Sequence, residues 1–81
     1  DSFSIFPNPT GGNATLSVSN QLDNNSRVVI TNQVGQTVKV IDADAFLNNK
    51  VAIDLTPYQR GVYFVTVYTI DLNTTKRIVK N

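Results

Sequence analysis

The stretch LTPYQRGVYFVTV, residues 55–67, decides the fold of this chain. From residue 61 onward the side chains alternate between two faces, one with Tyr63, Val65 and Val67, the other with Val62, Phe64 and Tyr68. Alternation with a period of two over this length predicts a β-strand with one buried face. Pro57 and Gly61 precede the strand, where a proline fixes the backbone of a crossing and a glycine allows a tight entry.

Tyr63 predicts how this strand is connected to the one before it. In immunoglobulin-like sandwiches, a tyrosine near the start of a strand donates its hydroxyl to the backbone of the preceding crossing. Tyr63 stands at this place, and Leu55 stands where the preceding strand ends. We therefore expect Leu55, Gly61 and Tyr63 to form a structural block that shapes a corner of the fold and performs no chemistry.

Six further segments are short, alternating and rich in β-branched residues, which favours strands. They cover residues 2–6, 13–19, 27–32, 36–41, 50–55 and 74–80. Within 36–41 we expect Val38 and Val40 to face the core and Lys39 to face solvent. Gly35 suits a tight hairpin, and residues 42–49 have room for a single helical turn. The pattern predicts an all-β fold, an antiparallel immunoglobulin-like β-sandwich of about seven short strands.

The composition of the chain limits the classes of function that it can have. The 81 residues contain no His, Cys or Met, all six acidic residues are Asp, and the net charge is +1. A disulfide or a Cys/His zinc site is therefore excluded, and the weak charge argues against a nucleic-acid partner. We expect no enzymatic activity, no catalytic residue and no cofactor. Because Met is absent, we also expect the chain to be part of a longer protein.

Two binding alternatives remain open at this stage. Asp42 and Asp44 are the closest pair of carboxylates, and with Asn48 and Asn49 they offer oxygen ligands of the kind that calcium prefers. The competing interpretation is a solvated turn without a metal. Separately, the aromatic residues Phe46, Tyr58 and Tyr68 could stack on a sugar ring, as in a carbohydrate-binding or fibronectin-like spacer module.

The basic segment KRIVKN, residues 76–81, has two interpretations. Charged side chains protect an edge strand from pairing with other chains. Alternatively, the segment is a signal that a receptor reads, because the free N–H and C=O groups of an edge strand invite strand addition. An edge strand of this kind also makes an edge-to-edge dimer possible.

Four stretches carry a resemblance to a known family. FPNPTGG, TNQVGQTV, IDLTPYQRGVYFVTV and TKRIVKN occur in this order over nearly the whole chain. Together they are similar to the C-terminal sorting domain (type A) of proteins exported by the type IX secretion system of Bacteroidota. The resemblance implies that residues 1–81 form a single C-terminal sorting domain of a larger secreted protein.

The resemblance also assigns residues. Pro7, Asn8 and Pro9 match the signature turn of the family, together with Gly35 in the mid-domain turn. Leu55, Gly61 and Tyr63 match its late structural block. The segment that matches the tail recognised by the translocon contains Lys76, Arg77, Ile78, Val79 and Lys80.

The implied function is that of a secretion signal. The family implies passage through the periplasm, translocation across the outer membrane, and removal by a sortase-like surface peptidase, with release or surface attachment of the cargo. The implied partners are the translocon and its shuttle proteins, the peptidase, and an N-terminal cargo domain in cis.

Overall fold

Alternating apolar and polar side chains give the chain a succession of short strands. The computed structural model describes residues 3–19, 22–23, 25–69 and 73–81. Within these residues the elements are β1 (Phe3–Phe6), β2 (Asn13–Val18), β3 (Arg27–Thr31), β4 (Thr37–Asp42), the 3₁₀ helix η1 (Ala43–Ala45), β5 (Lys50–Asp54), β6 (Gly61–Tyr68) and β7 (Asn73–Lys80).

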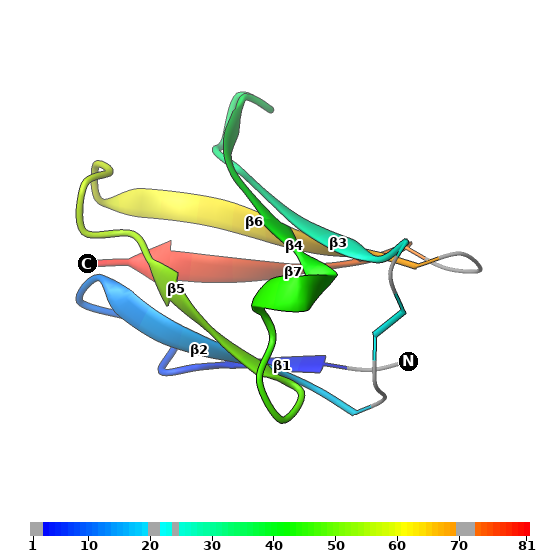
Figure 1. The fold of residues 1–81 in the computed structure, drawn as a ribbon. Helices are drawn as coiled ribbons and strands as arrows, with labels where there is room; N and C mark the ends of the chain where they lie inside the picture. Colours follow the sequence, from blue (N-terminus) through cyan, green and yellow to red (C-terminus); the bar gives the residue numbers. More distant parts are fainter. Residues whose placement is uncertain (1–2, 20–21, 24, 70–72) are drawn as a thin grey trace.

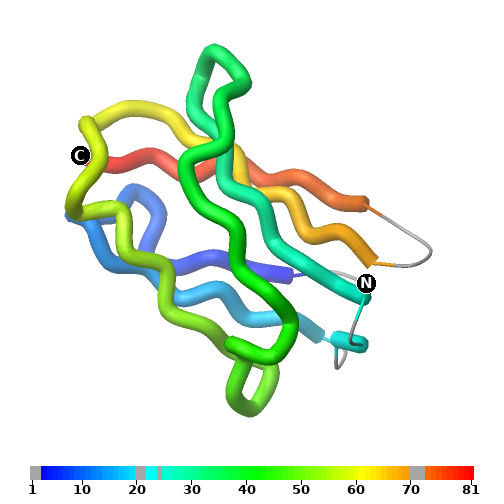
Figure 2. Tube along the Cα trace, turned by 45° about the horizontal axis from the view of Figure 1, so that its top comes forward, coloured from blue at the N-terminus to red at the C-terminus, as the bar shows by residue number. Residues whose placement is uncertain are grey.

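The strands form two antiparallel sheets that pack face to face (Figure 1). One sheet has three strands in the order β1-β2-β5, and the other has four in the order β4-β3-β6-β7. The tube in Figure 2 shows the two layers from a second direction. The predicted all-β antiparallel sandwich is confirmed, and β7 lies at one edge of its four-stranded sheet.

The core lies between the two sheets and draws on all seven of these strands. β6 contributes Tyr63, Val65 and Val67, the face that the alternation predicts to be buried. The largest side chains with an exposed fraction below 2% are Leu16, Ile30, Ile53, Leu55, Ile78, Val28, Val65 and Thr10. Since Ile78 is in this group, β7 contributes to the core as well as forming the edge of its sheet.

The expected orientation of one strand is wrong. Val40 is 53% exposed on β4, and Ile41 is buried in its place. The pairing of β3 with β4 changes register between Ile30 and Thr31, and one slipped residue exchanges the two faces of a strand. Val38 still packs against the core, while Lys39, expected to face solvent, is half-buried.

The corner before β6 is built as the sequence predicts. The Tyr63 hydroxyl donates a hydrogen bond to the carbonyl of Gln59, within the crossing that leaves β5. Leu55 is completely buried where that crossing begins, and its carbonyl accepts the Tyr58 N–H at 3.0 Å. These contacts fix the path from one sheet to the other.

Two tight hairpins complete the frame. Gly35 has a φ of 88° between β3 and β4, in the left-handed region that glycine adopts at low cost. Asn48 and Asn49, with φ of 54° and 65°, connect Leu47 to Lys50, which exchange two backbone hydrogen bonds. Two left-handed residues in succession give a two-residue hairpin, and asparagine tolerates this conformation.

Candidate functional site

Asn8 connects the first loop of the chain to its last strand. Its side-chain Nδ2 donates to the carbonyl of Arg77, and its Oδ1 accepts the N–H of Val79, each at 3.0 Å. One amide side chain thus satisfies a donor and an acceptor on the outer edge of β7, as a neighbouring strand would. We call this pair of bonds the Asn8 clamp.

Thr10 extends the clamp towards the end of β7. Its N–H donates to the carbonyl of Val79 and its carbonyl accepts the N–H of Asn81, both at 2.8 Å. Thr10 is only 1% exposed, and its hydroxyl donates to the carbonyl of Asn13 at 2.6 Å. The outer edge of β7 is therefore covered from Arg77 to Asn81.

The two prolines hold Asn8 in a segment that takes no part in either ladder. β1 ends at Phe6, and the chain then crosses from the three-stranded sheet to the edge of the four-stranded sheet (Figure 1). Both Pro7 and Pro9 follow cis peptide bonds. Neither has an N–H, so two fewer backbone donors need partners where the chain leaves β1.

Replacing Asn8 with Ala is expected to destabilise the domain by about 1–3 kcal/mol, because two bonds to β7 are lost together. Asn13→Ala, on the exposed face of β2, is the matched control. Urea denaturation gives the stability, and hydrogen exchange at the Val79 amide reports the clamp directly. Equal stabilities and equal Val79 exchange rates in the two variants would contradict the assigned role of Asn8.

The structure separates the five residues of the expected tail. Ile78 is completely buried, and Val79 is half-buried with its backbone held by the clamp. The Lys80 ammonium donates to the carbonyl of Thr56 at 3.2 Å and to that of Tyr58. Lys76 and Arg77 are the two tail residues that are exposed.

The corner that receives Lys80 also carries a carboxylate. Asp54 accepts hydrogen bonds from the hydroxyl of Thr56 at 2.6 Å and from its N–H at 3.0 Å. These bonds hold the pKa of Asp54 below its ordinary value, and the charges of Lys39 and Lys80 lower it further. Because the folded pKa is lowered, this contribution to stability is present at neutral pH and is lost on acidification.

The sequence of the chain also matches a known protein family. The family model described as a secretion system C-terminal sorting domain matches residues 4–81. The chain belongs to this family. No match was found among the curated proteins. Membership shows that the sorting domain is a C-terminal signal for type IX secretion, that it interacts with the secretion machinery, and that its protein is exported toward the outer membrane or cell surface.

The residues assigned by resemblance fall in separate parts of the sorting domain. Asn8 and the tail meet in the clamp, whereas Gly35 lies in the β3–β4 hairpin. Leu55 and Tyr63 form the corner, and that corner receives Lys80. Sequence reasoning missed Thr10, although a buried threonine beside the signature turn is the residue that completes the covered edge.

The structure gives little support to the alternative calcium and carbohydrate sites. Within the described ranges no cluster of three or more Asp, Glu, His or Cys side chains could hold a metal ion, so Asp42 and Asp44 gain no third acidic ligand. Tyr58 donates its hydroxyl to the carbonyl of Val38 at 2.9 Å, and Arg27 lies over the ring of Tyr68 at 4.7 Å. Tyr58 and Tyr68 are thus engaged by different neighbours, and Phe46 packs against the core cluster.

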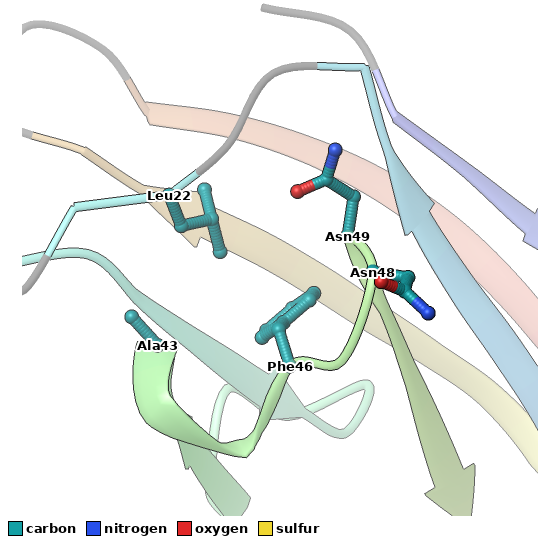
Figure 3. A pocket seen from close by; sticks show the side chains of 5 residues that line it. All are labelled: Leu22, Ala43, Phe46, Asn48 and Asn49. Carbon is teal, nitrogen blue, oxygen red and sulfur yellow. The ribbon is translucent and has the colours of Figure 1, made fainter.

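Phe46 lies in a small open pocket (Figure 3). The pocket has a volume of about 330 Å³ and is lined by Leu22, Ala43, Phe46, Asn48 and Asn49. The hairpin and residues that pack against the core form its walls, because Leu22 and Phe46 both contact the core cluster.

No helix in the described part of the sorting domain is long and apolar enough to cross a membrane.

Proposed function

We propose that the sorting domain is a passive label that the translocon and its shuttle proteins recognise after the protein has reached the periplasm. The cargo is an N-terminal domain in cis, and residues 1–81 are its C-terminal sorting domain. A sortase-like surface peptidase then removes the label, and the cargo is released or attached to the cell surface. The family match over residues 4–81 carries this proposal.

The chemistry of the side chains supports a role without catalysis. Lys80 and Tyr63 have their polar ends in backbone hydrogen bonds that hold the corner together. Lys76 and Arg77 remain exposed on β7, where a receptor can bind them. We infer that the domain presents a folded surface to the machinery and is a substrate of the peptidase.

A secretion assay tests the proposal. Residues 1–81 are fused to the C-terminus of a fluorescent reporter with its own signal peptide and expressed in Bacteroidota strains with and without the type IX system. We expect the reporter in the medium or on the surface of the first strain only. Retention in the periplasm of both strains would overturn the proposal and favour a spacer or carbohydrate-binding module.

A further inference from the structure

The outer edge of β7 has two halves. In the covered half, Asn8 and Thr10 bind the outward backbone groups; in the open half, these groups have no hydrogen-bond partner among the described residues. β6 and β7 pair without a register shift from Gly61↔Lys80 to Tyr68↔Asn73, so successive residues of β7 point their N–H and C=O groups alternately towards β6 and away from it. The bonds to the Asn8 clamp and Thr10 show that Arg77, Val79 and Asn81 point away. By the same alternation, Asn73 and Thr75 also point away.

The open half extends from Asn73 to the N–H of Arg77. Among the described residues, no hydrogen bond reaches the outward N–H and C=O groups of Asn73 and Thr75 or the N–H of Arg77. The Thr75 side chain is engaged separately, since its hydroxyl lies 2.8 Å from that of Thr66 on β6. Five adjacent backbone groups therefore form a short row available for an added strand.

Two cations flank this row on opposite faces of the sheet. The Lys76 side chain lies on the core-facing side, with its ammonium 5.4 Å from the centre of the Phe3 ring. Arg77 projects from the outer face, is exposed, and has no ion pair among the described residues. A strand added here would have one positive charge beside each of its faces, which favours a segment that carries carboxylates.

We propose that an extended acidic segment of the secretion machinery adds as a strand to β7 along Asn73–Arg77. This inference rests on the proposed function and says how the secretion machinery would bind the domain. The added strand stops at Arg77 because Asn8 and Thr10 already occupy the edge beyond it. The clamp thus limits the length and fixes the position of the added strand.

Thr75→Pro tests the proposal in the secretion assay. The substitution removes the outward N–H of Thr75 but no backbone hydrogen bond to β6, because proline is tolerated on an edge strand where its nitrogen faces solvent. It also removes the hydroxyl that contacts Thr66. Thr75→Val is the matched control, since it loses the same hydroxyl and keeps the N–H. We expect export to fall about tenfold for Thr75→Pro and to stay at the wild-type level for Thr75→Val.

The outcomes separate the two proposals. Without export of the unchanged fusion, the proposed function itself fails. If the unchanged fusion is exported and folded Thr75→Pro is exported equally well, strand addition is wrong. Circular dichroism and thermal melting of the purified domain establish whether Thr75→Pro is folded.

If Thr75→Pro does not fold, a double charge reversal on β7 tests strand addition instead. Lys76→Glu with Arg77→Glu is compared with Lys50→Glu and Arg60→Glu, two exposed cations that lie outside the Asn73–Arg77 row. Both pairs change the net charge equally. Strand addition by an acidic segment requires loss of export in the first pair only, and equal export of the two pairs would overturn it.

Discussion

Deletion of Lys76–Asn81 is expected to unfold the domain, and any loss of export would then say nothing about recognition. The deletion removes Ile78, which is completely buried, and loss of a side chain of this kind alone costs about 2–5 kcal/mol. It also removes most of the ladder between β6 and β7, and it removes the β7 partners of the Asn8 side chain and of the Thr10 backbone. A domain of this length is stable by about 4–12 kcal/mol in total.

The measurement is a comparison of two purified proteins. The truncated domain should show no cooperative thermal transition and poor dispersion of its amide NMR signals. A domain of full length with Lys76→Gln and Arg77→Gln loses the same exposed charges and should keep its fold. A cooperative transition in the truncated domain would contradict the role assigned to β7 and would make truncation a valid probe of recognition.

Leu55→Ala is expected to cost about 3 kcal/mol, within the range for a fully buried leucine. Leu55 has no exposed surface, and its N–H donates to the carbonyl of Gly12 at 2.7 Å where β2 begins. The cavity would form in the core, where the crossing from β5 to β6 begins. Since the backbone there is held by other bonds, the site has little freedom to collapse around the smaller side chain.

The chain provides its own control for this substitution. Leu47 is 76% exposed, so Leu47→Ala changes the same atoms and should shift stability by less than about 0.5 kcal/mol. Urea denaturation of both variants measures the difference. Similar losses for Leu55 and Leu47 would show that the corner is not the packed element described here.

Local patterns allowed most of the fold to be predicted. The alternation in β6 identified its buried face, and the sequence from Leu55 to Tyr63 identified the corner, because each depends on residues close together in the chain. The orientation of β4 was not predictable in this way. It depends on the register shift opposite Ile30, and a register is a property of two strands rather than of one.

The candidate site was predicted only in part. The resemblance pointed to Asn8 and to the tail, but nothing local indicated that they touch, since Asn8 and Val79 are separated by 71 positions. The resemblance assigned five residues to the tail that the translocon recognises. Burial of Ile78 and the bonds of Lys80 reduce the displayed side chains chiefly to Lys76 and Arg77.

The pairing of Thr10 with the end of β7 has a mechanical consequence. Thr10 and Lys80 form a parallel bridge, so the chain runs in the same direction on both sides of these hydrogen bonds. Tension between the chain before Thr10 and the chain after Lys80 therefore loads the bonds in shear, and they must rupture together instead of opening one by one. Under the proposed function, a pull from an N-terminal cargo against a held tail would load this pairing in shear.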